Sequence, residues 1–274
     1  MKNKKIIGLT LLSAPLISGC TNANNKTTPI KDSTNTPIKD ITNASTNTES
    51  VESENYQYYP LPDGTLSIAV GNNRDLQYLT ISKMHHGKMV TQIADNGFAN
   101  CTALKQINLP DSINMIREKA FFGCSSLNSI NIPDGTSVIE NYAFLDCSSL
   151  TSIVIPEGVT SISNGAFYDC SSLTSVTIPD SVTSIGVGAF EGCSSLTSIV
   201  IPGSVTSIGK YAFSDCKSLT SVVIPDSVTS IGGDAFRDCS SLTIYCAAEK
   251  KPEGWDDGWN PSDCPVVWAY KSKP

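Results

Sequence analysis

The sequence predicts a β-rich solenoid: a curved parallel sheet of short stacked strands, with few or short helices, capped at both ends. Three observations predict it. One motif recurs at a constant interval, as from Cys101 to Cys124 and on to Cys147. Each motif contains the apolar alternation of a strand, and non-repetitive segments with many aromatic residues flank the motifs. A unit this short has too few apolar side chains to fold alone, so it must bury them against copies of itself.

Composition sets the first limits on function. The chain has 274 residues, of which 40% are hydrophobic and 16% charged, so it has ample apolar material for a core. Acidic residues number 26 against 19 basic ones, and the formal net charge is −7. A basic footprint is missing, so nucleic acid is not an expected partner. The two histidines are adjacent, His85 and His86, which leaves little scope for metal or acid–base chemistry.

Residues 1–19 have the features of an export signal. Three lysines precede an apolar stretch, Ile6 to Ile17, which is too short for a transmembrane helix. The next residues, Ser18-Gly19-Cys20, complete a motif that resembles a bacterial lipobox, in which the chain is cut before the cysteine and the thiol is lipidated. We expect lipid attachment at Cys20; an ordinary signal peptide with a chance cysteine is the alternative. Losing the three lysines changes the net charge from −7 to −10.

Residues 20–55 are rich in Thr, Asn, Ser, Pro and Lys and contain a near-duplication, TPIKDSTN at 28–35 and TPIKDITN at 36–43. Such a segment cannot bury enough apolar surface to offset its ordering entropy. We expect a flexible tether between the lipid and the folded part.

Residues 101–242 carry the repeats. Six complete units run from 101 to 238 with the pattern C-x-x-L-x-x-[IV]-x-I-P-x-x-V-x-x-I-x-x-x-A-F-x-x. The alternation before the proline predicts a strand, which the proline ends because it has no N–H for a ladder. The V-x-x-I segment predicts a second short strand or extended arm. The A-F-x-x-C segment returns the chain, with the phenylalanine in the middle of the coil.

The repeated motif, quoted from Ile178 to Ile199 as IPDSVTSIGVGAFEGCSSLTSI, resembles the leucine-rich repeats of the BspA-like surface protein family. The resemblance covers about residues 56–270. It implies an N-terminal cap at 56–100, with an opening hairpin at Tyr59–Val70 and an irregular first half-repeat, and a closing cap at 243–274. The last cap also follows from composition, because all three tryptophans lie between 255 and 268, where a solenoid needs a lid. Gly97 and Thr136 depart from the pattern, where Ala and Val are usual.

The spacing of the repeat cysteines predicts a structural role in the core and not metal binding or disulfide formation. Cysteines that occur once per repeat stack in a column, which does not surround a metal ion, and their parallel Cβ vectors disfavour disulfides. Buried thiols that fill the core are expected. Cys246 and Cys264 lie outside the period, and either a disulfide between them or two buried thiols fits an exported protein.

Two acidic rows recur with the repeat. One follows the proline and one precedes the cysteine: Asp111, Asp134, Glu157, Asp180 and Asp226; Asp146, Asp169, Asp215 and Asp238. Stacked carboxylates suit Ca²⁺, but Asp at a turn, bonding its own backbone, explains the rows without a metal. We expect no metal site and no cofactor.

The outward positions of the predicted strands form the first candidate binding surface. They are uncharged and form two rows: Gln106, Ser129, Ser152, Ser175, Ser198 and Ser221; Asn108, Asn131, Val154, Thr177, Val200 and Val223. A second candidate comprises variable positions around A-F: Arg117, Lys119, Phe122, Tyr142, Leu145, Tyr168, Lys210, Tyr211 and Arg237. Aromatic residues and arginine are favoured at interface hot spots, although unconstrained turn positions explain this set equally well.

The lipobox-like motif implies a lipid anchor, and the family resemblance implies a surface protein that binds other proteins, in adhesion to host matrix proteins or other cells. The alternative is a scaffold that organises the cell's own envelope. Catalysis is not expected, because the repeats contain no histidine and no phosphate loop or paired-acid motif stands out. The expected contacts are therefore proteins and, through Cys20, the membrane, without a small-molecule substrate.

Overall fold

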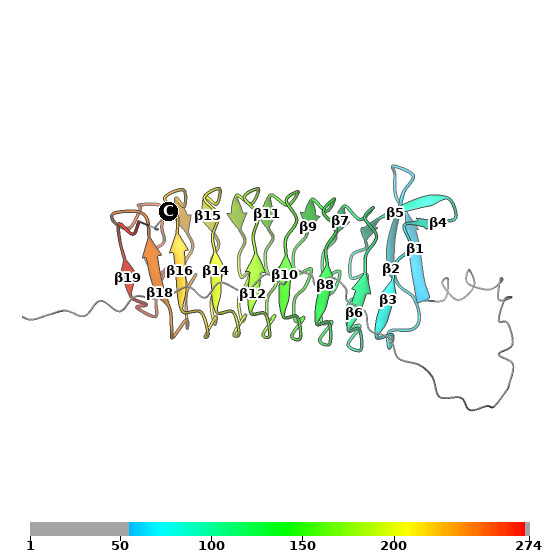
Figure 1. Cartoon of the computed structure of the whole chain (residues 1–274), viewed down its shortest axis with the longest axis horizontal. Helices are drawn as coiled ribbons and strands as arrows, with labels where there is room; N and C mark the ends of the chain where they lie inside the picture. The colour runs from blue at the N-terminus through cyan, green and yellow to red at the C-terminus, as the bar shows by residue number, and fades with distance from the viewer. Residues whose placement is uncertain (1–54, 272–274) are drawn as a thin grey trace, which may run out of the picture. The chain divides into compact units, whose positions relative to one another are not determined.

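The computed structural model describes residues 55–271; the predicted signal peptide, Cys20 and nearly all of the predicted tether lie outside them. The described chain is a β-solenoid of about nine turns, in which short strands and turns follow each other and no helix lies within residues 56–271 (Figure 1). The predicted solenoid fold is confirmed.

Nine strands stack in one row, which we call the first sheet. Its strands are β3 (Tyr78–Thr80), β6 (Gln106–Asn108), β8 (Ser129–Asn131), β10 (Ser152–Val154), β12 (Ser175–Thr177), β14 (Ser198–Val200), β16 (Ser221–Ile224), β18 (Thr243–Cys246) and β19 (Val266–Val267). The pairs are parallel, and between β6 and β16 partners lie one repeat apart, as in Ser152 with Ser175. The row consists of three hydrogen-bonded groups, β3-β6-β8, β10-β12 and β14-β16-β18-β19. β8 contacts β10, and β12 contacts β14.

A second sheet is formed by the V-x-x-I segments and by one strand of the N-terminal hairpin. Its strands are β2 (Leu66–Val70), β5 (Lys88–Ile93), β7 (Met115–Ile116), β9 (Val138–Ile139), β11 (Ser161–Ile162), β13 (Ser184–Ile185), β15 (Ser207–Ile208) and β17 (Ser230–Ile231). They form two hydrogen-bonded groups, β2-β5-β7-β9 and β11-β13-β15-β17. The predicted second strand therefore forms, at two residues per regular coil. Each inward isoleucine, such as Ile185, is buried.

The predicted opening hairpin forms and begins earlier than expected. β1 (Tyr56–Pro60) pairs antiparallel with β2, and β2 continues the second sheet by pairing parallel with β5. β4 (Met84–His85) pairs antiparallel with β5, in a small hairpin that the repeat pattern did not reveal. The glycine at position 97, where the repeat usually has alanine, has a steric cause. A Cβ there would lie 2.9 Å from the Ala94 carbonyl oxygen and 3.1 Å from that of Ile68.

A column of phenylalanine rings fills the centre of the solenoid. Seven rings, Phe98 to Phe236, stack with centroids 5.2–5.6 Å apart and planes within 10° of parallel. All seven side chains are fully buried. Trp259 ends the column edge-on, with its centroid 5.9 Å from that of Phe236. Trp255 is buried beside it and donates its indole N–H to the Val228 carbonyl oxygen at 3.0 Å. The tryptophans thus cover the last ring, as a lid must.

The turns around each phenylalanine require left-handed backbone at two positions. The residue before the cysteine has φ between 53° and 74° in every coil from Asn100 to Asp238, and it is Asn, Asp or Gly throughout. These are the residue types that adopt this conformation at low cost. The acidic row before the cysteines therefore has a backbone cause. The residue before the alanine is also left-handed, yet three coils place Lys119, Tyr142 and Tyr211 there.

Removing one ring from the middle of the column will destabilise the whole solenoid. We expect Phe167→Ala to lower the free energy of unfolding by about 3–5 kcal/mol, because the neighbouring coils cannot collapse into the space that the ring leaves. The measurement is a urea titration followed by circular dichroism. Val187→Ala, at a valine that is 48% exposed, is the control and should change little. Equal effects of the two substitutions would show that the column is not the stabilising element.

Candidate binding surface

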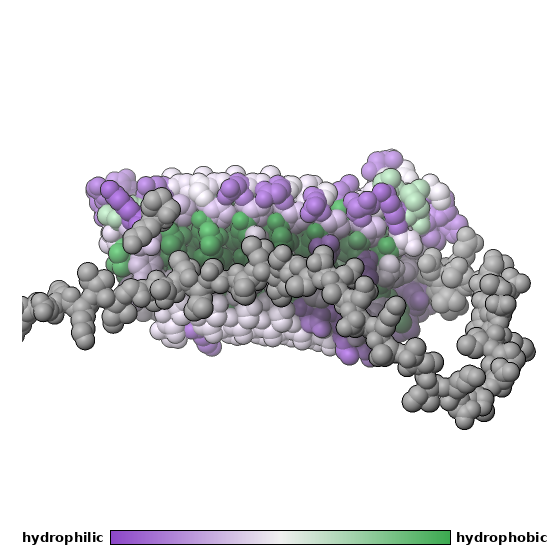
Figure 2. Space-filling view, in the orientation of Figure 1, coloured by the Kyte–Doolittle hydropathy of each residue, from purple (hydrophilic) through white to green (hydrophobic). Residues whose placement is uncertain are grey.

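The structure brings the twelve predicted surface residues together on the outer face of the first sheet. Eleven are exposed, and Ser221 is half-buried. The strand residue between the two rows points inward in each coil, as Ile153 and Val222 show. Val154 and Val200 are 65% and 78% exposed, so this face carries apolar side chains that the fold itself does not bury. Figure 2 shows a hydrophobic band along this side of the molecule, over the region of β10 to β16.

The two rows change in chemistry along the solenoid. At the N-terminal end they hold amides: Gln106 Nε2 donates to Asn108 Oδ1 at 3.3 Å, and Asn108 Nδ2 donates to Thr80 Oγ1 at 3.2 Å. Towards the C-terminal end valines replace the amides. The face therefore offers hydrogen-bonding groups at one end and apolar contact at the other, without a charged side chain in either row.

Sequence reasoning missed the residues that extend the rows at both ends. Tyr78 pairs with Gln106 and Thr80 with Asn108, an offset of 28 residues, which is longer than the repeat. At the other end Thr243 pairs with Ser221 and Tyr245 with Val223, an offset one residue shorter than the repeat. Because these offsets break the period, only the x-apolar-x alternation of Tyr78-Leu79-Thr80 could have indicated a strand there. Tyr78, at 66% exposed, is more exposed than Tyr245 at the other end of this face.

The second candidate surface divides into two kinds of turn. Lys119 lies over the Tyr142 ring at 5.7 Å and Lys210 over the Tyr211 ring at 4.6 Å, which are cation–π pairs. Tyr168 instead lies near carboxylates, and the negative charge of Glu191 is the main cause that raises the pKa of the Tyr168 phenol. The turns of this second candidate surface therefore differ in chemistry from coil to coil.

Carboxylates crowd the turns near Tyr168. Partial burial, followed by the charges of Asp146 and Asp215, raises the pKa of Asp169. Burial, followed by the charges of Asp215 and Asp169, raises the pKa of Glu191. Across residues 55–271, however, no three His, Cys, Asp or Glu side chains are placed to hold a metal ion.

The repeat cysteines are buried and free, as expected, and they also form hydrogen bonds that the sequence did not suggest. From Cys124 to Cys239, each thiol donates to the carbonyl oxygen of the phenylalanine 26 residues earlier, at 3.0–3.2 Å. Each thiol therefore satisfies a buried carbonyl of the preceding coil, in addition to filling space.

The disulfide between Cys246 and Cys264, one of two alternatives, does not form, and both residues are free thiols. Ile244 pairs with Val266, so Cys264 lies beside the residue before β18, whereas Cys246 ends that strand. The two levels are separated by about 13 Å of strand, and a disulfide needs Cα atoms within about 7 Å. Cys264 instead continues the cysteine column, with its thiol 3.4 Å from the Cys239 carbonyl oxygen.

Comparisons with known proteins agree with this geometry. Residues 72–196 and 160–250 match the family described as "BspA type Leucine rich repeat region", with six copies. The chain belongs to the BspA-type leucine-rich repeat proteins. These are cell-surface proteins, and leucine-rich repeats generally bind other proteins and are typically non-catalytic.

Two solved structures of bacterial proteins are similar to this family member. It is similar to a leucine-rich repeat protein of T. pallidum, at 31% identity and a TM-score of 0.65 over 69% of this chain and 89% of that one. It is also similar to a leucine-rich cell surface protein of Faecalibacterium prausnitzii, at 29% identity and a TM-score of 0.55 over 76% of this chain and 71% of that one. A search of curated proteins found no match. No helix within residues 55–271 is long and apolar enough to cross a membrane.

Alkaline pH will unfold this BspA-type protein steeply. Burial raises the pKa of each thiol in the column, and it brings those of Cys239 and Cys246 to about 12. A thiol that ionises only after unfolding contributes stability that is complete below the unfolded pKa of about 9 and is lost as pH rises towards the folded pKa. Each such thiol costs about 1.4 kcal/mol of unfolding free energy per pH unit above that value. We expect the urea midpoint to fall sharply between pH 9 and pH 10.

The control for this prediction is Cys246→Ala, which removes one titrating thiol from the end of a strand. The pH slope of the unfolding free energy should decrease by about one proton, whatever the absolute stability of the variant. A urea midpoint that stays constant from pH 8 to pH 10 would show that burial does not hold the thiols protonated.

Proposed function

We propose that this protein is a lipid-anchored adhesin, which presents the outer face of its first sheet to proteins outside the cell. The observation that carries the proposal is the pair of uncharged outward rows, with Val154 and Val200 largely exposed. Exposed apolar side chains that gather on one face are characteristic of surfaces that meet a partner. The expected partners are extracellular-matrix proteins or proteins on other cells.

The parallel stacking makes this face flat and repetitive. Neighbouring strands lie about 4.8 Å apart, so equivalent side chains repeat at that spacing along the sheet. A partner would bind through many small contacts instead of one deep pocket. The rim carries the charge: with a net charge of −10 after loss of the signal peptide, long-range attraction favours basic partners or basic patches.

The adhesion proposal predicts that a charge in the rows abolishes binding. The full chain, purified in mild detergent, is titrated against immobilised matrix and plasma proteins at low and high salt. Val200→Lys should weaken binding by at least about tenfold, because the interface would bury an unpaired ammonium group. Val187→Lys, also at an exposed valine but outside these rows, should bind as the unchanged protein does. Absence of saturable binding to every protein tested would contradict adhesion.

Lipid anchoring predicts that Cys20→Ser releases the protein from the membrane. The cells are grown with an alkyne-bearing fatty acid, and incorporated lipid is detected on the purified protein. The unchanged protein should carry the label and sediment with membranes, and the variant should do neither. Label on both proteins would place the lipid at another residue, and label on neither would exclude lipid attachment. Lys2→Gln, which keeps the cysteine, is the control.

The alternative function is an envelope scaffold, in which the same face binds components of the cell's own surface. The two functions differ in their need for the anchor, because a soluble fragment can adhere but cannot organise an envelope. Crosslinking of the lipidated protein on its own cell, with Val200→Lys as the negative control, separates them.

A further inference from the structure

A cavity of about 290 Å³ opens where the N-terminal hairpin meets the first coils. Tyr59 of β1 and Ser67 of β2 contribute to its lining, together with Ala94 and Asp95, which follow β5, and Arg117, which follows β7. These strands belong to the hairpin and the second sheet, so the cavity does not include the outer rows of the first sheet. Its volume is at the small end of the range for ligand pockets.

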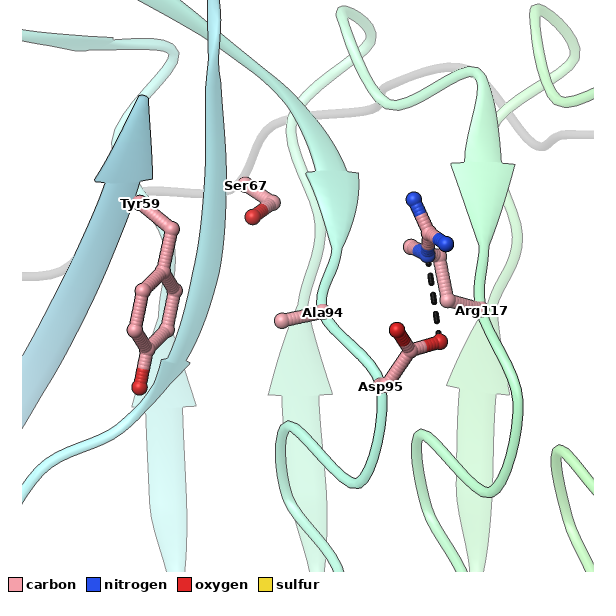
Figure 3. A pocket seen from close by; sticks show the side chains of 5 residues that line it. All are labelled: Tyr59, Ser67, Ala94, Asp95 and Arg117. Atoms are coloured by element: carbon pink, nitrogen blue, oxygen red, sulfur yellow. Dashed lines mark hydrogen bonds and ion pairs between the residues drawn. The ribbon is translucent and has the colours of Figure 1, made fainter. Parts of the chain in front are cut away.

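The cavity has two chemically different sides. In Figure 3 Tyr59 lies on one side and the Asp95–Arg117 pair on the other, with Ser67 and Ala94 between them. Ser67 and Ala94 are buried, whereas Tyr59 is 46% exposed. The aromatic ring is therefore accessible from the solvent, opposite a pair of charged groups.

Hydrogen bonds hold both sides in place. Arg117 Nε donates to Asp95 Oδ1 at 3.1 Å, and Arg117 Nη1 lies 3.4 Å from Gln92 Oε1. The Tyr59 hydroxyl donates to Gln57 Oε1 at 2.7 Å. Asp95 Oδ2 and Arg117 Nη2 take no part in these bonds. A carboxylate oxygen acceptor and a guanidinium donor thus remain for a ligand.

The solenoid does not need these side chains. In three later coils the position of Arg117 is glycine, at 186, 209 and 232, and the position of Asp95 is Val187, Lys210 and Gly233. An exposed tyrosine opposite a charged pair is likewise absent from the repeat pattern. Stacking of the coils therefore does not require an arginine or an aspartate at these two positions.

The chemistry of the cavity selects a neutral polyhydroxy ligand. Adjacent hydroxyls of a sugar ring match the free groups, since one hydroxyl donates to a carboxylate oxygen and the next accepts from a guanidinium N–H. The ion pair is already neutralised within the protein, so a charged ligand gains no counter-ion. The apolar C–H face of a pyranose packs against an aromatic ring, and the Tyr59 hydroxyl keeps its bond to Gln57 outside that contact.

We propose that this cavity binds one pyranose unit of a neutral glycan, with Tyr59 as the stacking platform and the Asp95–Arg117 pair as the hydroxyl-binding group. The proposal is independent of protein binding by the first sheet. A zwitterionic amino acid is the competing ligand, which would need the ion pair to open, with Asp95 taking its ammonium group and Arg117 its carboxylate.

Saturation-transfer NMR on the full chain tests the proposal, with a panel of neutral methyl pyranosides and of free amino acids. Each is added up to about 20 mM, because so few contacts to a single sugar correspond to millimolar binding. We expect at least one pyranoside to bind, with signals strongest on its C–H face. Binding of amino acids alone, or of nothing by a chain with an intact β spectrum, would overturn the proposal.

Variants then assign the binding to this cavity. Tyr59→Ala should weaken the pyranoside about tenfold, Tyr59→Phe should retain it, and Arg117→Lys should weaken it because the fork of N–H donors is lost. Tyr78→Ala, at an exposed tyrosine of the first sheet, is the matched control and should leave sugar binding unchanged. Retained affinity in both Tyr59→Ala and Arg117→Lys would place the sugar elsewhere and overturn the proposal. Val200→Lys should not affect it, so failure here is separable from failure of adhesion.

Discussion

The stacking of one phenylalanine on the next is the interaction on which the rest of the structure depends. Each ring of the column, from Phe98 to Phe236, is buried only because the coils before and after it supply its walls. The register of both sheets follows, since a coil that slipped by one residue would move its ring out of the column and its isoleucines to the outside. The ends follow as well. A column of rings has two open faces, so the chain must provide non-repetitive lids, and the edge-on Trp259 and the hairpin of β1 and β2 occupy those places.

The same stacking decides what the surface can be. Every outward position becomes a row of equivalent side chains at strand spacing, and like charges at that spacing repel. The rows of the first sheet are accordingly uncharged, with Gln, Ser, Asn, Thr and Val. Where carboxylates do stack, at the turns near Asp169 and Glu191, burial and their mutual repulsion raise their pKa values. In the regular coils the strands thus carry no charged side chain, and the outer face of the first sheet is left for contacts without net charge.

The fold was predictable because the period is carried by residues whose burial is obligatory. One Phe and one Cys recur in every repeat, with an Ile at a fixed position, and the stacked coils bury all of them. Prediction failed where the period fails. β3 is offset from β6 by 28 residues because β4 and its turn are inserted before β5, so Tyr78 escaped the surface assignment. Cys264 is separated from Cys239 by 25 residues and still joins the column, which removes it from reach of Cys246. The thiol-to-carbonyl bonds depend on where Phe carbonyls point, which no spacing of letters reveals.

The two proposed binding sites differ in the same way: the rows of the first sheet lie in the periodic part of the chain, and the cavity lies where the period breaks. Repeated coils place the same kinds of side chain at the same positions, so they form rows of similar groups. Such rows suit a broad partner that is bound through many weak contacts. A site with one ring, one acceptor and one donor needs residues that occur once. Such residues are tolerated where stacking constrains the chain least, at the junction between the hairpin and the first coils. Within residues 55–271 two antiparallel strand pairs adjoin the second sheet, β1 with β2 and β4 with β5, and Tyr59 belongs to the first of them. Arg117 occupies a position that is glycine in three later coils. The location of the cavity at this junction is therefore a consequence of the repeat architecture.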